Sequence, residues 1–256
     1  MAFTISLANQ KGGVGKTTSA VNIAAAIGAL DKRVLLVDLD PQGNSTSGVG
    51  VQRRTVKVST YDVIIGNAKA SEAVVNTGFR NLSLMPSQIA LAGAEFELIE
   101  LERRELLFRD ALSEIEGDFD YIFIDCPPSL GILTINSLTA VDSVLIPIQC
   151  EFYALEGVSQ LMSTIDIVRR NMNPDLKIEG VILSMFDGRT NLSIQVVEEV
   201  KKYFKEKVYT TVIPRNVRLA EAPSYGMPVI QYDPKSAGAQ AYMEFADEFL
   251  ANEEGR

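Results

Sequence analysis

The sequence of 256 residues contains no histidine, no tryptophan and only two cysteines, Cys126 and Cys150. Without histidine, acid–base catalysis by imidazole is excluded. The two cysteines form no C-x-x-C pair, so the chain offers no pattern for a zinc site. We expect both cysteines to be small buried residues in strands, and neither metal ligands nor a disulfide.

Long apolar runs are also missing. The best candidate for a membrane span, residues 131–150, is interrupted by Asn136, Asp142 and Pro147. The N-terminus starts with a strand-like run and has no basic leader, so we expect no signal peptide and a cytoplasmic protein. No polar or Pro/Gly-rich stretch is long enough to link two domains, which predicts a single domain over residues 1–256.

Acidic residues outnumber basic ones by 33 to 24, and the resulting net charge of −9 argues, taken whole, against a nucleic-acid partner. The distribution is uneven, because residues 181–235 contain eight basic residues and six acidic ones. A solvated helix face is the usual explanation of such a segment, so the asymmetry alone is weak evidence for an anionic partner.

Apolar runs of strand length alternate with helix-length segments along most of the chain. The strand-like runs are mostly continuous rather than alternating, as buried parallel strands require. The pattern predicts an α/β fold, a doubly wound and mostly parallel sheet with helices on both faces, in which ligands bind beyond the carboxyl ends of the strands. The predicted strands are 3–8, 33–38, 81–85, 120–125, 143–148, 178–185 and 209–213, and the predicted helices include 17–30, 93–116, 154–171, 191–204 and 236–250.

Residues 9–18 read Asn-Gln-Lys-Gly-Gly-Val-Gly-Lys-Thr-Thr and lie between the first predicted strand and the first predicted helix. The glycines leave backbone N–H groups free to surround phosphate oxygens, and the positive end of the helix faces the same anion. Lys16 adds a positive charge for the terminal phosphates, and Thr17 supplies a hydroxyl for Mg²⁺. The segment therefore predicts a phosphate-binding loop.

This loop departs from the usual G-x-x-x-x-G-K-T pattern. Gln10 stands where the first glycine is expected, and a second lysine, Lys11, follows it. Lys11 cannot easily reach a phosphate bound by its own loop, but it could reach one held by a second subunit. The alternative is a glycine-rich turn with solvated lysines, against which the strand before and the helix after both argue.

Two predicted strands end in aspartates at the edge of the sheet that carries the loop. Asp38 and Asp40 follow one strand, and Asp125 ends another. Asp125 is the candidate for holding Mg²⁺ through a coordinated water. Asp40 is the candidate for orienting the attacking water, because phosphoryl transfer needs placement and charge stabilisation more than a strong base. The alternative for each aspartate is a helix cap or a turn former.

Together these residues resemble the ParA/Soj family of plasmid and chromosome partitioning ATPases, which belongs with MinD to a deviant phosphate-loop group. The resemblance looks closest to the chromosomal Soj branch, because no helix-turn-helix extension precedes the first strand. It implies a P-loop NTPase that binds ATP and Mg²⁺ and hydrolyses ATP to ADP and phosphate. The segments that carry it are 11–18, 35–44, 123–130, 133–140, 153–157 and 212–224.

The resemblance implies a site shared by two ATP-bound subunits, with Lys11 of one touching the phosphates held by the other. Lys11, Lys16 and Asp40 would be catalytic, and Thr17 and Asp125 would hold the metal. Pro214, Arg215 and Asn216 would lie on the adenine side. The implied nucleotide-binding residues are Lys11, Gly12, Gly13, Val14, Gly15, Lys16, Thr17, Thr18, Pro214, Arg215 and Asn216.

The resemblance also implies partners. The ATP-dependent homodimer would bind double-stranded DNA without sequence preference, which would make the protein cytoplasmic and nucleoid-associated. Arg189 and Arg218 fall at the family's DNA-contact positions, although Arg218 could instead pair with Glu221. A ParB/Spo0J-like protein would stimulate slow hydrolysis and release the dimer, and no membrane would take part.

Three rival functions are left by the sequence. A MinD-like membrane-cycling ATPase needs a basic amphipathic C-terminal helix, but the polar side of residues 242–254 is acidic. An iron–sulfur or metal-cluster carrier needs cysteines that bridge two subunits. A non-hydrolysing adaptor would only bind nucleotide, and Asp40 argues against it.

Overall fold

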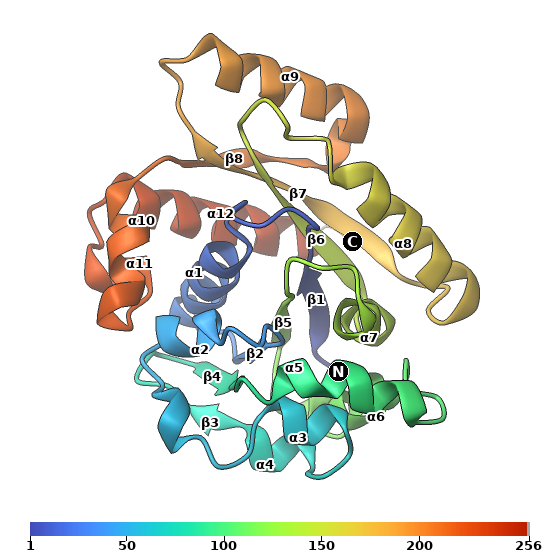
Figure 1. Ribbon diagram of the computed structural model, residues 1–256. Helices are drawn as coiled ribbons and strands as arrows, with labels where there is room; N and C mark the ends of the chain where they lie inside the picture. Colours follow the sequence, from blue (N-terminus) through green and yellow to red (C-terminus); the bar gives the residue numbers. More distant parts are fainter. Residues whose placement is uncertain (255–256) are drawn as a thin grey trace.

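An eight-stranded sheet runs through the protein in the order β3-β4-β2-β5-β1-β6-β7-β8 (Figure 1). The computed structural model describes residues 1–254. All of the pairings are parallel except that of β3 with β4, so the predicted α/β fold with a mostly parallel sheet is confirmed. The strands are β1 (Phe3–Leu7), β2 (Val34–Asp38), β3 (Val75–Asn76), β4 (Leu82–Met85), β5 (Tyr121–Asp125), β6 (Ser143–Gln149), β7 (Lys177–Phe186) and β8 (Val208–Pro214).

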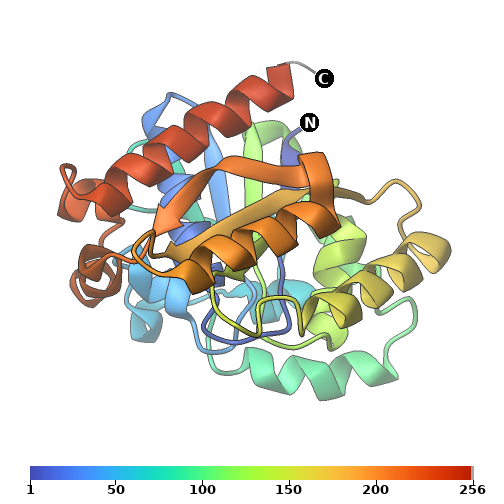
Figure 2. The same cartoon turned by 90° about the horizontal axis from the view of Figure 1, so that it is seen from above.

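Helices cover both faces of this sheet, as the alternating pattern predicts (Figures 1 and 2). Helices α1 and α12 pack together on one face, while α6, α7 and α8 lie on the other. The helices are α1 (Lys16–Ala29), α2 (Asn44–Gly48), α3 (Thr60–Ile64), α4 (Ala70–Ala73), α5 (Leu91–Glu97), α6 (Leu107–Ser113), α7 (Ile132–Ala140), α8 (Val158–Asn171), α9 (Asn191–Phe204), α10 (Val217–Glu221), α11 (Val229–Tyr232) and α12 (Ala237–Glu254), with short 3₁₀ turns between some of them.

Two apolar cores result, one on each face of the sheet. Successive strand residues point to opposite faces, so Leu36 of β2 packs in the core beneath α1 and α12, and Leu35 packs in the other. Phe245 and Phe249 of α12 are fully buried in the first core. These layers hold the central strands in place, and the loops at their carboxyl ends are therefore presented from a fixed frame.

The carboxyl ends of the central strands meet at one edge. Leu7 pairs with Asp125 across β1 and β5, and Asp38 pairs with Asp125 across β2 and β5. The loop from Ala8 to Gly15 therefore emerges beside the two strand-terminal carboxylates. This is the edge at which the sequence places a ligand.

The predicted helix at 93–116 is wrong as a single element. Helix α5 ends at Glu97, a 3₁₀ turn follows over Leu98–Glu100, and turns separate it from α6. Arg103 within this break has a φ of +54°, which a helix does not allow. Tertiary packing overrides helix propensity here. Both α5 and α6 pack on α3, but α6 also packs on α7, so the two segments do not continue as one helix.

Three smaller differences also separate the prediction from the structure. Helix α8 begins at Val158 and not at residue 154, because residues 151–157 form turns and Glu151 pairs with Arg215. The short antiparallel strand β3 was not predicted, since two residues carry no detectable periodicity. Cys126 and Cys150 are buried as expected, but each follows a strand and does not lie within one.

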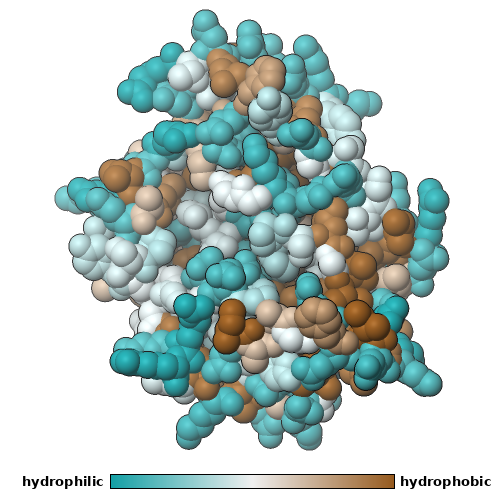
Figure 3. Space-filling view, in the orientation of Figure 1, coloured by the Kyte–Doolittle hydropathy of each residue, from teal (hydrophilic) through white to brown (hydrophobic). Residues whose placement is uncertain are grey.

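The surface carries some exposed apolar side chains. Phe96 of α5 and Ile99 of the following 3₁₀ turn are 76% and 60% exposed, and apolar residues gather over the lower half of the face shown in Figure 3. Among the helices of residues 1–254, none combines the length and the apolar character needed to cross a membrane.

Candidate nucleotide-binding site

The loop between β1 and α1 has the backbone that a phosphate loop requires. Gly13 and Gly15 have φ values of +75° and +86°, in the left-handed region that favours glycine. Gly15 is the N-cap of α1, so the loop ends at the positive end of a helix that is 14 residues long. A side chain at either glycine would strain this turn.

Hydrogen bonds with residues of two strands, β6 and β7, hold the loop in place. The side-chain amide of Asn9 donates to the carbonyl of Pro147 in β6 at 2.8 Å, while its oxygen accepts from the backbone N–H of Lys11 at 3.0 Å. The Ser184 hydroxyl in β7 donates to the carbonyl of Val14 at 2.7 Å. The loop is therefore held in shape before any ligand arrives.

A cleft of about 390 Å³ opens above this loop. It brings together most of the predicted phosphate-side residues, which come from the loop, from the start of α1 and from the segment after β2. Val14 is buried behind the loop and does not line the cleft. The lining residues are Gly12, Gly13, Gly15, Lys16, Thr17, Thr18, Asp40, Gln42, Asn44, Pro128 and Met185.

Lys16 is a buried cation at the base of the cleft. Only 6% of the residue is exposed, and its Nζ donates to the backbone carbonyl of Lys11 at 3.0 Å. Burial lowers the pKa of Lys16, and the negative charges of Asp125 and Asp40 oppose this shift. A phosphate oxygen would supply the counter-charge that this position favours.

Asp125 presents one oxygen without a partner. Its Oδ2 accepts from the Ser45 hydroxyl at 2.8 Å, whereas its Oδ1 is buried and makes no hydrogen bond within residues 1–254. Burial raises the pKa of Asp125, and the hydroxyls of Ser45 and Thr17 and the charge of Lys16 oppose the rise. Asp125 is 0% exposed and does not itself line the cleft that Thr17 lines, so its contact with Mg²⁺ through a coordinated water stays a prediction.

The two aspartates after β2 have different surroundings. Asp40 lines the cleft, is 7% exposed, and accepts from the backbone N–H of Gln42 at 2.9 Å through Oδ1. Asp38 is fully buried, and its carboxylate accepts from the backbone N–H and the hydroxyl of Thr46. Burial and the facing carboxylate of Asp125 raise the pKa of Asp38. The turn-forming alternative thus describes hydrogen bonds of both aspartates, since Asp38 accepts from the Asp40 N–H and Asp40 accepts from the Gln42 N–H.

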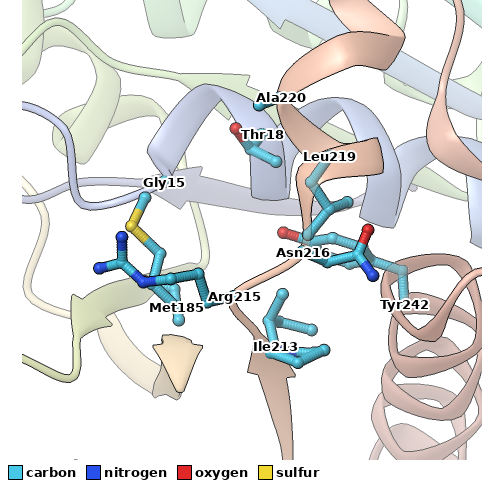
Figure 4. A pocket seen from close by; sticks show the side chains of 11 residues that line it. Gly15, Thr18, Met185, Ile213, Arg215, Asn216, Leu219, Ala220 and Tyr242 are labelled. Atoms are coloured by element: carbon cyan, nitrogen blue, oxygen red, sulfur yellow. The ribbon is translucent and has the colours of Figure 1, made fainter. Parts of the chain in front are cut away.

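A second, more apolar cavity of about 280 Å³ adjoins the cleft (Figure 4). The two share Gly15, Thr18 and Met185, so a single ligand could occupy both. The predicted adenine-side residues all lie here, although their contact with adenine stays a prediction. The lining residues are Gly15, Thr18, Ser184, Met185, Ile213, Pro214, Arg215, Asn216, Leu219, Ala220 and Tyr242.

Met185 belongs to the site but is not marked by any sequence motif. It follows Ser184 in β7, lines both cavities, and has a φ of +53°. Such a backbone conformation is uncommon for a residue with a side chain and often occurs at ligand sites. In Figure 4 the side chain lies next to that of Arg215.

Lys11 does not line the cleft formed by its own loop. It lines a neighbouring cavity of about 630 Å³ together with Cys150, Phe152 and Tyr153. The two aromatic residues are 74% and 59% exposed. The structure thus separates the two lysines that the sequence places in one loop.

The predicted DNA contacts lie outside these cavities, and each arginine is ion-paired. Arg189 is 89% exposed and pairs with Asp187 at 2.7 Å. Arg218 pairs with Glu221 at 2.7 Å and with Asp233 at 3.1 Å, so the alternative partner considered for it is confirmed as a contact. Arg189 lies in the turn before α9, and Arg218 lies in α10 (Figure 1).

The cysteines have no reactive surroundings. Cys126 is 1% exposed and lies 3.1 Å from the Ser6 hydroxyl, and Cys150 is 2% exposed. Burial raises the pKa of the Cys126 thiol to about 11 and that of Cys150 to about 12, so both thiols stay protonated at neutral pH. Within residues 1–254, no three His, Cys, Asp or Glu side chains cluster as metal ligands would.

Comparison with known proteins gives extensive matches. A family model described as an AAA domain matches residues 2–178. The sporulation initiation inhibitor protein Soj of Bacillus subtilis is 56% identical over 252 residues, which cover 98% of this chain and all of that protein. The chromosome-partitioning ATPase Soj of Thermus thermophilus is 48% identical over 247 residues, which cover 96% and 95% of the two chains.

A solved structure adds ligands to this comparison. Cobyrinic acid a,c-diamide synthase from Mycobacterium smegmatis, with a bound ATP analogue and magnesium, is similar with a TM-score of 0.88 and 41% identity. The match covers 100% of this chain and 98% of that one. A similar protein therefore binds a nucleotide and magnesium on the same fold.

Proposed function

The chain belongs to the ParA/Soj family of chromosome-partitioning ATPases, and we propose that it is a DNA-binding switch that ATP closes into a dimer. In the ATP form, two copies bind double-stranded DNA without sequence preference. Slow hydrolysis, stimulated by a ParB/Spo0J-like protein and DNA, returns the copies to the free state. The proposal follows the partitioning relatives because their identity, 56% and 48%, exceeds that of the diamide synthase.

One observation carries the nucleotide part of this proposal. The phosphate cleft and the apolar cavity meet at Gly15, Thr18 and Met185, which gives a single channel with a cationic and an apolar end. ATP has the matching shape, with phosphates at one end and a flat base at the other. We place the phosphates on the glycine loop and Lys16, and the adenine against Pro214 and Asn216.

Magnesium fits the other side of the cleft. Thr17 lines the cleft and would bind the ion, and Asp125, whose buried Oδ1 has no hydrogen-bond partner within residues 1–254, would accept from a metal-bound water. When bound, the ion neutralises charge on the phosphates. Asp40 lines the same cleft, and we assign it the placement of the attacking water.

The position of Lys11 supports a role across a subunit boundary. Lys11 lines a cavity outside the cleft, while its backbone carbonyl accepts from the ammonium group of Lys16. A lysine that does not contact its own ligand can contact the ligand of a facing copy. Each nucleotide would then bridge two chains, which makes dimerisation depend on ATP.

Arg189 and Arg218 are the proposed DNA contacts. Each is a cation that pairs with nearby acids on an exposed surface, and surface ion pairs of this kind contribute little to stability. Phosphates can therefore replace the acids at little cost. A dimer doubles the number of contacts, so an acidic protein can still bind DNA weakly and with strong salt dependence.

The rival functions have less support. The apolar residues of α12, among them Tyr242, Phe245 and Phe249, are buried against the sheet and α1 and are not available to lie on lipid. The buried, protonated thiols of Cys126 and Cys150 do not suit a cluster shared between subunits. A non-hydrolysing adaptor would not need a carboxylate such as that of Asp40 in the cleft, because it has no attacking water to position.

DNA binding measured with ATP, with ADP and without nucleotide, over a salt series, tests the proposal. We expect binding only with ATP, no preference among duplex sequences, and an affinity that falls steeply as salt rises. Sedimentation with anionic liposomes and ATP is the parallel measurement for a membrane role. Equal DNA binding with ATP and ADP, or liposome binding that requires ATP, would contradict the proposal.

A further inference from the structure

Asp38 lies in the middle of a buried hydrogen-bond network around Asp40. One oxygen of its carboxylate, Oδ1, accepts from the backbone N–H of Asp40 at 3.2 Å. The other oxygen, Oδ2, accepts from the backbone N–H and the hydroxyl of Thr46, both at 2.7 Å. A single carboxylate therefore joins the two ends of the segment from Leu39 to Ser45.

Thr46 extends this network to the next strand. Its hydroxyl donates to Asp38 and at the same time accepts from the backbone N–H of Ser87 at 2.9 Å. The Ser87 hydroxyl in turn donates to the carbonyl of Asp40 at 2.7 Å. The backbone N–H of Asp40 thus donates directly to Asp38. The backbone carbonyl of Asp40 is connected to Asp38 through Ser87 and Thr46.

The members of this network do not contact the cleft. Asp38, Thr46 and Ser87 are all 0% exposed, and none of them lines the cavity that Asp40 lines. Their hydrogen bonds go to the backbone of Asp40. Within the described residues, the hydrogen bond given for the Asp40 carboxylate is the one that it accepts from the backbone N–H of Gln42. The network therefore fixes the position of the Asp40 backbone and leaves the carboxylate oxygens free to bind other groups.

We propose that Asp38 and Thr46 are positioning residues for ATP hydrolysis, which hold Asp40 at the distance from the phosphates that the reaction needs. This inference rests on the proposed role of Asp40. A misplacement of about 1 Å can cost a rate on the order of 100-fold, so loosening the segment lowers turnover even when the nucleotide still binds.

The chain contains a matched control for Thr46. Thr4 in β1 donates its backbone N–H and its hydroxyl to one oxygen of Asp142, at 2.8 and 2.7 Å, and its hydroxyl accepts the Asp142 N–H at 2.9 Å. Thr4 is buried like Thr46, but it lies near the start of β1, away from the edge that carries the site. Replacing either threonine by valine removes two bonds of the hydroxyl, one donated to a carboxylate and one accepted from a backbone N–H.

The test compares Thr46→Val with Thr4→Val, and uses Thr46→Ser as the conservative variant. For each we would measure kcat and KM for ATP, the Kd of a fluorescent ATP analogue, and Tm. We expect Thr46→Val to lower kcat about 10- to 100-fold with the Kd within twofold. Thr46→Ser restores most of the rate, and Thr4→Val keeps the wild-type kcat despite a similar loss of Tm.

A double mutant separates this inference from the function on which it rests. In an Asp40→Ala background, Thr46→Val should cause no further loss of kcat, because Thr46 acts through Asp40. Wild-type turnover by Asp40→Ala would remove the proposed role of Asp40 itself. If Asp40→Ala is slow but Thr46→Val is not, or if the two losses multiply, the positioning role is wrong and the role of Asp40 stands.

A second variant covers the case in which Thr46→Val does not fold. Asp38→Asn keeps the shape of the side chain but turns one acceptor into a donor, so the side chain loses either the two Thr46 bonds or the bond from the Asp40 N–H. We expect the same loss of kcat with an unchanged Kd for the analogue. Wild-type kcat in a folded Asp38→Asn protein would overturn the inference.

Discussion

The ammonium nitrogen of Lys16 lies 3.0 Å from the backbone carbonyl oxygen of Lys11, so the buried lysine spans its own phosphate loop. The contact keeps the cation in place at the base of the cleft while leaving its other hydrogens free to donate. Lys11 meanwhile lines a different cavity. The two lysines of the loop therefore have separate surroundings, and their substitutions should have separable effects.

Replacing Lys16 by alanine should strongly weaken nucleotide binding. The variant removes the only lysine in the cleft, and charge-assisted bonds to phosphate are strong, so we expect the Kd for ATP to rise about 100-fold, which is roughly 2.7 kcal/mol. Isothermal titration calorimetry with Mg²⁺ and ATP measures it. Lys57→Ala, which changes an exposed lysine outside the cleft, is the control and should bind ATP like the wild type.

Replacing Asp40 by alanine should separate binding from hydrolysis. The carboxylate lines the cleft but takes no part in the loop that surrounds the phosphates, so the affinity for ATP should stay within a few-fold. Turnover should fall about 100-fold, the contribution expected of a group that places the attacking water. A phosphate-release assay at saturating ATP would measure this, and unchanged turnover would refute the role given to Asp40.

The pH dependence of stability should report on the buried carboxyl of Asp125. Burial raises its pKa above the unfolded value, so the folded state favours the protonated form and loses stability as pH rises from the ordinary carboxyl range through the raised pKa. Asp125→Asn removes the share of this loss that belongs to Asp125, and it also removes the charge that helps to raise the pKa of Asp38. The nucleotide-free variant should therefore show a smaller fall in Tm between pH 5 and pH 8 than the wild type.

The size of that effect follows from the chain length, at about 2–4 °C for each kcal/mol. Asp110→Asn, at an exposed carboxylate, is the control and should leave the profile unchanged. The same Asp125→Asn variant should lose the extra stabilisation that Mg²⁺ adds to ATP in the wild type. A profile equal to that of the wild type would mean that Asp125 does not carry the buried charge.

Substituting Arg189 and Arg218 together should remove DNA binding and leave ATP affinity intact. Each lost phosphate contact lowers the slope of log K against log salt by roughly 0.9, and a dimer would lose up to four contacts. Fluorescence anisotropy with a short duplex and ATP measures the slope. Arg33→Ala is the control, because Arg33 is likewise exposed and ion-paired, with Asp120 at 2.8 Å. Wild-type DNA binding by the double variant would remove the proposed contacts.

Much of the fold could be predicted because its signals are local. Most of the predicted strands are continuous apolar runs, and the structure has a strand within two residues of each predicted boundary. The phosphate loop could be predicted because glycines at 13 and 15 are needed for its backbone. The break at Arg103 could not, since good helix formers surround it and the cause is packing between distant helices.

The parts of the site that escaped prediction depend on contacts across the sheet. Met185 joins the two cavities through the register of β7, which no motif records. The pairing of Asp38 with Thr46 could not be predicted either. The sequence places an aspartate at a strand end but does not show which donors surround it. Asp233, the second partner of Arg218, lies 15 residues away along the chain and is brought close only by the turns between them.

The molar mass in solution tests the central claim most directly. The chain has a mass of 28.0 kDa, and light scattering would be recorded with saturating Mg²⁺ and ATP on the slow Asp40→Ala protein, with and without Lys11→Ala. We predict a dimer for Asp40→Ala with ATP, a monomer with ADP, and a monomer with ATP once Lys11 is also replaced, although ATP still binds. A monomer with saturating ATP, or a dimer that survives the loss of Lys11, would contradict the account.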